Sequence, residues 1–414
     1  MPDQPLQKKR AVLRSPAYLS DFRCIGAECT DPCCYGWDIF VDKPTYLRYR
    51  DLPASGLGKK IRKAVRPNRK DPSDAHYARI HRKGDTCPFL TPDGLCRIHA
   101  ELGEDSLPDT CAVFPRHRRA RKDGIDISAS LACPEIARRA LEPARGIEII
   151  ESDLDPSAAD SLRGVEPGKS PEIEAAGRML QDFAIPFLQD RTHSLWMRVL
   201  ALGLLLEKIG SSKASWGAAA LPSMLDEFSR RMGSGELVDW MEHAPTLTHL
   251  QLQLVKRLHD ELMPGVKGTA FKECADECLA GLGYTDEQGF PADLAQRYDA
   301  AFARDYRPFF ERYGFMLENY LVSHLLHHEL GFQQGRRLYE DYILMVLHFA
   351  MIKTYLIGMS AWHGASFHPA AVVKLIYSFT KAVEPDARFR DYALGILSES
   401  GCTDMMHLAV LIKN

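Results

Sequence analysis

The stretch that most constrains how this chain folds lies at residues 22–37, FRCIGAECTDPCCYGW, which carries four cysteines within eleven residues. Two of them, Cys33 and Cys34, are adjacent, and glycine and proline residues interrupt the stretch, which disfavours a regular helix or strand. Adjacent cysteines do not easily form a disulfide with each other because disulfide geometry is demanding. The stretch therefore predicts a loop that wraps around a metal centre.

Four more cysteines follow in the same half of the chain, each beside a turn or a helix end. The turn sequence TPDG at residues 91–94 should bring the thiols on its two sides together. In a reducing compartment, a dense cysteine pattern favours metal ligation over disulfides. We therefore expect the metal ligands to come from eight thiols: Cys24, Cys29, Cys33, Cys34, Cys87, Cys96, Cys111 and Cys133.

That compartment follows from the absence of export and membrane signals. The N-terminal residues are basic but no apolar run follows them, so they do not predict a secretory signal. The most apolar run, residues 199–206, is much shorter than the roughly 20 residues that span a bilayer. We expect a cytoplasmic protein that does not enter a membrane.

Charge is distributed unevenly along the chain. Residues 1–145 contain 27 Lys and Arg against 19 Asp and Glu, a net charge of +8, whereas residues 146–414 contain 25 against 36, a net charge of −11. We interpret the basic excess as a solvated face that also compensates the charge of cluster thiolates, or alternatively as a binding surface for an acidic partner. No aromatic residues interleave the basic runs, so the pattern does not favour nucleic-acid binding.

Local signals predict strands and turns in the first part of the chain. Short strands are expected at residues 37–41 and on both sides of the turn at residues 122–124. Ser106 and Asp109 have the spacing of a capping box, which would start the helix that contains Cys111. Each cysteine would then be presented from a turn or from near a helix end.

Residues 143–171 contain four prolines with several small polar residues, which is typical of a domain boundary. From residue 172 onward, apolar residues recur at three- and four-residue spacing and predict a series of helices. We expect a mainly α fold. A small, irregular cysteine-rich metal-binding domain with short strands occupies residues 1–145, a linker residues 146–170 and a large helical bundle domain residues 171–414.

Two clusters in the helical part have both a structural and a metal-binding interpretation. Cys274 and Cys278 lie one helical turn apart, and we interpret them as buried small residues. His324, His327, His328 and Glu329 share about one turn, a spacing that could hold zinc. Because the order H-E-x-x-H is missing, we interpret this second cluster as a polar helix end.

Several common enzyme motifs are missing from the sequence. It contains no glycine-rich phosphate loop and no G-x-G-x-x-G after a strand, so an ordinary nucleotide site or a doubly wound methyltransferase is not indicated. It also lacks the G-x-S-x-G elbow of α/β-hydrolases. Any chemistry should therefore involve the cysteine-rich half.

Four cysteine blocks and one later block carry a family resemblance. The blocks are FRCIGAECTDPCCYGWDIFVDKPTYLRY, CPFL followed by GLCRIHAELGE, CAVFPR, SLACPEIA and, at residues 317–322, LENYLV. Together they resemble the flagellin lysine-N-methylase family, densely over residues 18–140 and sparsely beyond. The resemblance implies an S-adenosylmethionine-dependent protein-lysine N-methyltransferase that carries an iron–sulfur cluster, expected to be 4Fe-4S, and acts on flagellin.

Carried over to this sequence, the resemblance assigns the eight cysteines as metal ligand candidates. Since one 4Fe-4S cluster takes at most four protein thiolates, eight exceed the need of a single cluster. The spacing C-x4-C-x3-C-C also departs from the C-x3-C-x2-C loop of radical enzymes, so radical chemistry is not inferred. The eight thiols must therefore be divided between cluster ligands and other roles, and we expect this division to be centred on Cys33 and Cys34.

Lysine methylation makes further demands, because the attacking amine must be neutral. From a pKa near 10.4, its deprotonation at pH 7 costs roughly 4–5 kcal/mol. An acidic or phenolic group must take the proton, and we name Glu318 and Tyr320 as candidates because they lie in the LENYLV block. Arg116 could pair with the cofactor carboxylate or form a structural salt bridge.

A non-enzymatic alternative fits the same cysteines. Two zinc ions with four thiolates each would use all eight, and structural zinc contributes on the order of 10–16 kcal/mol to folding in small domains. The helical part would then be a scaffold for binding a partner.

Overall fold

The computed structural model describes residues 11–70, 73–82, 84–154, 162–211, 219–284, 291–330, 336–399 and 404–414. The chain divides into two compact units. Unit 1 comprises Met1–Ile136 and Glu148–Lys169, and unit 2 comprises Ala137–Ile147 and Ser170–Asn414. The fold is mainly α with small sheets, as predicted.

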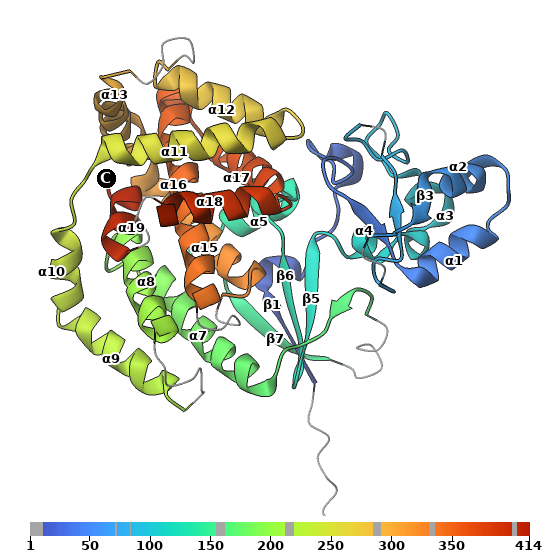
Figure 1. Cartoon of the computed structure of the whole chain (residues 1–414), viewed down its shortest axis with the longest axis horizontal. Coiled ribbons are helices and arrows are strands. Elements are labelled where there is room, and N and C mark those ends of the chain that lie inside the picture. Colours follow the sequence, from blue (N-terminus) through green and yellow to red (C-terminus); the bar gives the residue numbers. More distant parts are fainter. Residues whose placement is uncertain are drawn as a thin grey trace, which may run out of the picture. The chain divides into compact units, whose positions relative to one another are not determined.

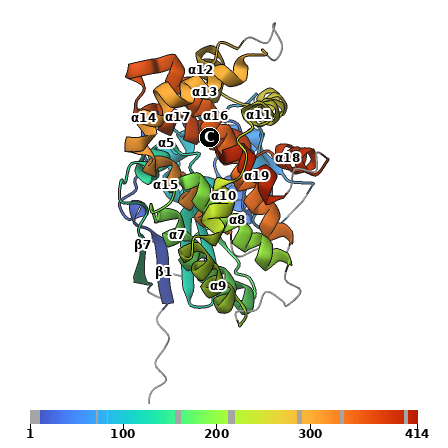
Figure 2. The ribbon, with the colours of Figure 1, turned by 90° about the vertical axis from the view of Figure 1, so that its left-hand side faces the viewer.

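A five-stranded sheet organises one part of unit 1. Its strands, in spatial order, are β7 (Ile149–Leu154), β1 (Ala11–Pro16), β6 (Gly124–Ala129), β5 (Arg116–Arg121) and β8 (Val165–Glu166). Strands β5 and β6 form the predicted antiparallel hairpin, while β1 pairs with β6 in parallel and with β7 antiparallel. Figure 2 shows β1 and β7 side by side. Residues 146–170, expected to be a linker, thus contain two strands of this sheet.

The cysteines lie among short elements around a second, three-stranded sheet. The strands in order are β2 (Ile39–Val41), β4 (Ala78–Ile80) and β3 (Val65–Pro67). The helices are α1 (Lys43–Asp51), α2 (Gly56–Ala64), α3 (Arg97–Leu102) and α4 (Asp109–Val113), with 3-10 turns η1 (Ala17–Leu19), η2 (Gly26–Glu28) and η3 (Glu104–Ser106). Their apolar core includes Val41, Ile61, Ile80, Phe89 and Ile98, and Cys34, Cys96 and Cys111 pack against it.

One buried carboxylate joins two of these helices. Asp42 accepts hydrogen bonds from the backbone N–H of Thr45 at the start of α1 and from that of Asp109 at the start of α4, both at 2.9 Å. The predicted capping box at Ser106 is therefore wrong. Ser106 instead ends η3, and its hydroxyl donates to the Leu102 carbonyl. The carboxylate of Asp42, which is distant in sequence, caps the start of α4 in its place.

Unit 2 is built from helices, and the chain enters it within α5 (Pro134–Leu141). The first group is α7 (Pro171–Gln189), α8 (Leu195–Ser211), α9 (Leu221–Gly233), α10 (Glu236–Glu242), α11 (Thr248–Leu262), η4 (Met263–Gly265) and α12 (Ala270–Gly281). The second is α13 (Leu294–Ala301), the π-helix η6 (Phe302–Tyr306), α14 (Arg307–Tyr313), α15 (Phe315–His327), α16 (Arg336–His363), η7 (Gly364–Ser366), α17 (Pro369–Val383), α18 (Ala387–Glu399) and α19 (Met405–Ile412).

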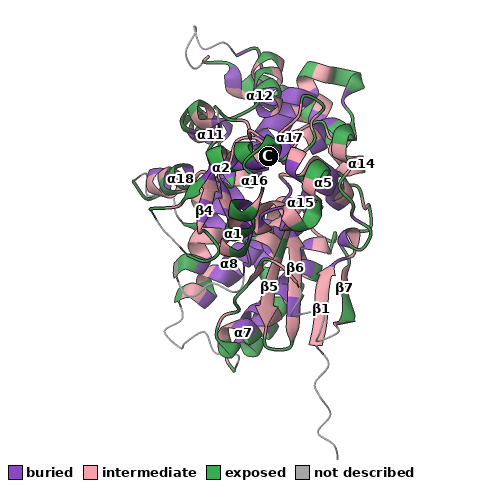
Figure 3. Ribbon diagram, turned by 90° about the vertical axis from the view of Figure 1, so that its right-hand side faces the viewer, coloured by how far each residue is buried: buried purple, intermediate pink, exposed green. Residues whose placement is uncertain are grey.

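Helix α16 forms the centre of unit 2. It contacts α8, α11, α12, α17, α18 and α19, and Figure 1 shows it running between them. The helix is long and apolar enough to cross a membrane by length and composition, but 94% of its most apolar window is buried by the rest of the protein. Outer helices such as α7 carry both buried and exposed residues, as the colours of Figure 3 show.

Close packing of α12 on α16 explains the cysteine pair of unit 2. Cys274 and Cys278 are both buried, as predicted for structural residues. A Cβ atom added to Gly358 of α16 would lie 2.5 Å from the Cys278 sulfur and 2.5 Å from its carbonyl oxygen. The small residues at this crossing let the two backbones approach each other.

Candidate metal centre

The cysteine-rich loop of unit 1 is shaped by backbone hydrogen bonds and one aromatic contact. Cys29 closes the turn η2 by donating its N–H to the Gly26 carbonyl at 3.1 Å, and Gly26 has a φ of +58°, which favours glycine. The Trp37 indole donates to the Cys33 carbonyl, and the Trp37 ring packs on Phe114 with centroids 5.1 Å apart. These contacts fix a turn near the start of the loop and anchor its end at Trp37.

A second segment brings its cysteines to this loop. The Cys87 N–H donates to the Cys34 carbonyl at 3.0 Å, and Tyr35 forms a β-bridge with Thr86. The turn at residues 91–94 folds as predicted, so that Leu90 and Cys96 form a β-bridge across it. Cys96 lies at the N-terminus of α3, and Cys111 lies within α4.

The eight predicted ligands divide into two groups. In the first, which we call the Cys34 group, the thiol of Cys34 is within hydrogen-bonding reach of Cys87, and Cys96 and Cys111 interact electrostatically with Cys87. The second, the Cys29 group, joins Cys29, Cys24 and Cys133. Cys33 interacts with members of both groups.

The electrostatics of the thiols show what a bound cation would supply. Burial raises the pKa of Cys29, Cys96, Cys111 and Cys133, that of Cys133 to about 12, and the neighbouring thiols raise these values further. Hydrogen bonds with Cys33 and then with Cys87 raise the pKa of Cys34, and the hydrogen bond that the Cys34 thiol donates to Cys87 lowers the pKa of Cys87. A bound metal cation would compensate the charge of thiolates this close together.

Backbone donors point toward several of the sulfurs. Cys133 is stabilised as a thiolate by the N–H groups of Glu135 and Ile136 at the start of α5, and Cys96 by the N–H groups of residues 98 and 99 in α3. The N–H groups at a helix N-terminus favour a negatively charged sulfur. The donor set of thiols and N–H groups therefore fits a metal–thiolate centre.

Arg116 lies next to the cysteine-rich loop. Its guanidinium donates to the Phe22 carbonyl at 3.0 Å and lies over the Phe22 ring, 4.8 Å from the centroid. Burial lowers the pKa of Arg116, and nearby Glu104 and Cys133 act in the opposite direction. The structure therefore places this cation beside the first residue of the loop and within electrostatic range of the Cys29 group.

The two other predicted site residues lie in unit 2, on α15. Glu318 is 1% exposed and accepts hydrogen bonds from Arg191 at 2.8 and 3.1 Å and from Arg198 at 2.9 Å. Tyr320 is also buried, which raises the pKa of its phenol. Both oxygens of Glu318 are engaged by guanidinium groups, and its role as a proton acceptor stays a prediction.

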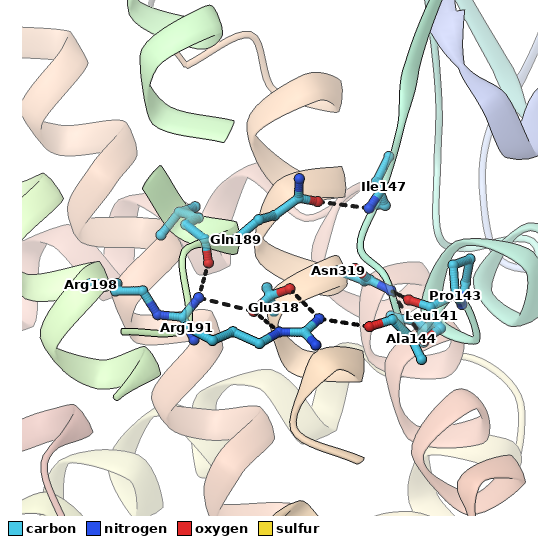
Figure 4. A network of polar contacts seen from close by, with 10 residues as sticks. Leu141, Pro143, Ala144, Ile147, Gln189, Arg191, Arg198, Glu318 and Asn319 are labelled. Atoms are coloured by element: carbon cyan, nitrogen blue, oxygen red, sulfur yellow. Dashed lines mark hydrogen bonds and ion pairs between the residues drawn. The ribbon is translucent and has the colours of Figure 1, made fainter. Parts of the chain in front are cut away.

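These contacts belong to a polar network that holds the segment following α5 (Figure 4). Next to Glu318, the Asn319 amide donates to the carbonyls of Leu141 and Pro143 at 3.3 and 2.9 Å. Arg191 donates to the Ala144 carbonyl, and Gln189 accepts from the Ile147 N–H at 2.7 Å. Asn319 of the family-like block, together with Gln189 and Arg191, thus anchors residues 141–147.

Sequence reasoning did not find Arg191 and Arg198. They precede Glu318 by 127 and 120 residues, so no local spacing relates them to it. The only available signal was the polar triplet at residues 318–320 inside an apolar helix, which indicated that buried polar side chains needed partners.

A separate cavity in unit 2 is small and apolar. It has a volume of about 50 Å³ and is lined by α11, α12, α13 and α16, including Val255, Leu282 and Leu294. Ligand sites for cofactor-sized molecules are usually about 300–1,000 Å³. The cavity therefore does not suit S-adenosylmethionine.

Comparison with known proteins gives consistent matches. A family model described as the FliB lysine N-methylase C-terminal domain matches residues 181–411, more than half of the chain. The flagellar biosynthetic protein FliU of Salmonella muenchen is 34% identical over 138 residues, which is 32% of this chain and 79% of that protein. No solved structure matches.

Two curated proteins named lysine-N-methylase also match. They come from Salmonella choleraesuis strain SC-B67 and Salmonella typhimurium strain LT2, and each is 32% identical over 151 residues. The match covers 35% of this chain and 36% of each relative. The chain therefore spans about a third of the length of these two relatives.

Proposed function

This chain belongs to the FliB lysine N-methylase family, and from that premise we propose that it is a protein-lysine N-methyltransferase that acts on flagellin in the cytoplasm. It uses S-adenosylmethionine and an iron–sulfur cluster of the 4Fe-4S type. The names of the relatives, lysine-N-methylase and flagellar biosynthetic protein, support the reaction and the kind of substrate. The thiols of unit 1 support the proposed cofactors.

The observation that carries the proposal is the division of the eight thiols. The Cys34 group contains Cys34, Cys87, Cys96 and Cys111, which is as many thiolates as one 4Fe-4S cluster takes. The Cys29 group contains three. A cluster held by three protein thiolates supplies, when bound, an iron that can act as a Lewis acid toward the amino and carboxylate groups of S-adenosylmethionine.

Sulfur spacing supports a cluster over single zinc ions. A tetrahedral zinc with bonds of about 2.3 Å holds its sulfur ligands about 3.8 Å apart. Among the described residues, no three thiols have all their sulfurs within 4.8 Å of one another. The looser arrangement suits a multi-iron centre, whose thiolates bind different iron atoms.

Arg116 would hold the cofactor beside the Cys29 group. A guanidinium has five N–H donors in a fork that matches a carboxylate, and the Arg116 guanidinium donates one hydrogen bond to the Phe22 carbonyl. Charge-assisted hydrogen bonds contribute about 1.5–3 kcal/mol. We expect Arg116→Ala to raise the KM for S-adenosylmethionine about tenfold or more, whereas Arg119→Ala on the same strand should leave it unchanged.

The proton of the substrate lysine needs an acceptor, and Glu318 and Tyr320 remain the proposed candidates. Glu318 can accept a proton only if its contacts with Arg191 and Arg198 open, since both of its oxygens are engaged. The observed contacts support a positioning role for Glu318. A catalytic role would appear as a shifted pH profile of kcat in Glu318→Gln, whereas a positioning role leaves that profile unchanged.

The decisive experiment is methyl transfer with anaerobically reconstituted protein. The protein is incubated with S-adenosylmethionine and the flagellin of the same bacterium, and methyl additions on lysine are measured by mass spectrometry. We expect methylation by the wild type and by Cys274→Ala, a thiol of unit 2, and a loss of methylation in Cys29→Ala and Cys34→Ala.

Three outcomes would count against the proposal. Colourless protein with about two zinc ions per chain and no methylation would favour the partner-binding scaffold. Equal methylation by wild type and Cys34→Ala would exclude cluster-dependent catalysis. Methylation of a different protein would keep the reaction and replace flagellin as the substrate.

A further inference from the structure

Three side chains with metal-binding atoms converge in unit 2. His327 ends α15 and His328 follows it, while Glu384 follows α17. Their ligand atoms all lie within 4.8 Å of one another. We propose that these residues bind a divalent transition-metal ion of the zinc class, with two imidazole nitrogens and one carboxylate oxygen as protein ligands.

The distances within the triad suit a shared ion better than hydrogen bonds. The Nε2 atoms of His327 and His328 lie 3.6 and 3.7 Å from the same oxygen, Oε1 of Glu384. Hydrogen bonds between nitrogen and oxygen are about 2.7–3.2 Å long. Bonds of about 2.0–2.1 Å to a tetrahedral zinc place ligand atoms about 3.4 Å apart. The two nitrogen–oxygen distances are therefore within a few tenths of an ångström of that separation, and the two nitrogens lie within 4.8 Å of each other.

Other histidine–carboxylate pairs of unit 2 show the difference. His363 Nε2 lies 3.0 Å from Glu277 Oε2, and His407 Nδ1 lies 2.8 Å from Asp404 Oδ1. These are ordinary hydrogen-bonding distances. In the triad, by contrast, two imidazole nitrogens lie near one carboxylate oxygen, and both of these distances are longer than those of the two pairs.

The surroundings favour a cation and orient the ligands. His328 and Glu384 cap the C-termini of α15 and α17, where the helix dipoles favour positive charge. The His328 ring packs on His324 with centroids 4.2 Å apart, and it lies at 81° to the His327 ring. Ring packing of this kind holds ligands in place before an ion binds.

The site is accessible to an ion from solvent. The side chain of His328 is 38% exposed and that of Glu384 is 23% exposed, whereas His327 is 10% exposed. Three protein ligands with water in the fourth position are a common zinc arrangement. The bound ion ties the end of α15 to the end of α17, and this inference uses no thiol, so it does not depend on the proposed methyltransferase activity.

Metal counting on the full-length protein tests the site. Chelator-treated protein is titrated with Zn²⁺, freed of unbound ion by gel filtration and analysed for zinc per chain. We expect the wild type to retain one more zinc per chain than Glu384→Gln and His328→Asn. The matched control Glu277→Gln, which removes a carboxylate from the His363 pair, should retain as much as the wild type.

Co²⁺ distinguishes this site from the thiols of unit 1. Sulfur-to-cobalt charge-transfer bands report on the thiols, and the two site variants should leave these bands unchanged while losing only the visible d–d absorption that the nitrogen–oxygen site adds. Zinc should also raise the thermal midpoint of the helical signal in the wild type but not in either variant. Equal zinc content in the wild type and both variants overturns the proposal, and so does an equal loss in Glu277→Gln.

Discussion

The two units use the same residue type in opposite surroundings. In unit 1, cysteines lie at turns and helix starts, next to one another and next to backbone N–H donors. In unit 2, Cys274 and Cys278 are buried on one face of α12, and burial raises the pKa of each to about 12. A candidate metal centre thus differs from cysteines that only fill a core. In the candidate centre, thiols from several segments converge and N–H donors can stabilise them as thiolates.

The two units also differ in what stabilises them. Unit 1 has short elements with a small apolar core that includes Cys87 and against which Cys34, Cys96 and Cys111 pack. Unit 2 has a long central helix, covered by others, and a buried network around Glu318. We therefore expect unit 1 to depend on bound metal and unit 2 to fold without the cysteine-bound metal, and four predictions test this difference.

The largest expected effect is that of removing the metal. A chelator under reducing conditions should unfold the cysteine-rich part of unit 1, because metal binding by thiolates contributes on the order of 10 kcal/mol in small domains. The helical circular dichroism signal, which comes mostly from unit 2, should persist. Proteolysis followed by mass spectrometry should then show new cleavage sites in residues 17–113 only, and protection unchanged by the chelator would contradict the prediction.

The second effect concerns the buried network of unit 2. Glu318→Gln leaves Arg198, which is 5% exposed, without its carboxylate and should lower the free energy of unfolding by about 3–5 kcal/mol. Arg191→Ala should cost about 1 kcal/mol or less, because that side chain is 49% exposed. Urea unfolding measures both, and equal losses would show that burial does not govern this network.

The third effect tests the packing role of Cys278. Gly358→Ala should destabilise unit 2 by about 1–3 kcal/mol, because the new methyl group meets the Cys278 backbone. Gly395 of α18 has no atom within 4 Å of an added Cβ, so Gly395→Ala should instead stabilise by about 0.5–1 kcal/mol. Thermal unfolding of the two variants tests this, and we expect the midpoint to fall in Gly358→Ala and to rise in Gly395→Ala.

The smallest effect is a pH dependence in unit 2. Burial lowers the pKa of Lys353 from 10.5 to about 7, so between these values the unfolded state binds more protons than the folded state. Stability should therefore rise with pH in this window. From pH 7.5 to 9.5 we expect the wild type to gain about 2 kcal/mol relative to Lys353→Met, measured by urea unfolding. Parallel pH profiles of the two proteins would refute this.

Sequence patterns of short range predicted the local structure well. The turn chemistry at residues 122–124 correctly indicated the β5–β6 hairpin, and apolar periodicity indicated the helices after residue 172. The capping box at Ser106 failed, because Asp42 reaches the start of α4 from 67 residues away. A local pattern cannot report a partner that comes from another element.

By itself, the sequence determined which cysteines could serve as ligands and that the chain is mainly helical. Both depend on residue type and on spacings of three to five positions, which lie within a single helix, strand or turn. Only the tertiary structure decided the partners. It divided the thiols into the Cys34 and Cys29 groups, paired Glu318 with Arg191 and Arg198, and brought Glu384 rather than Glu329 to the histidines. Those partnerships depend on the packing of elements far apart in the chain, which no local spacing records.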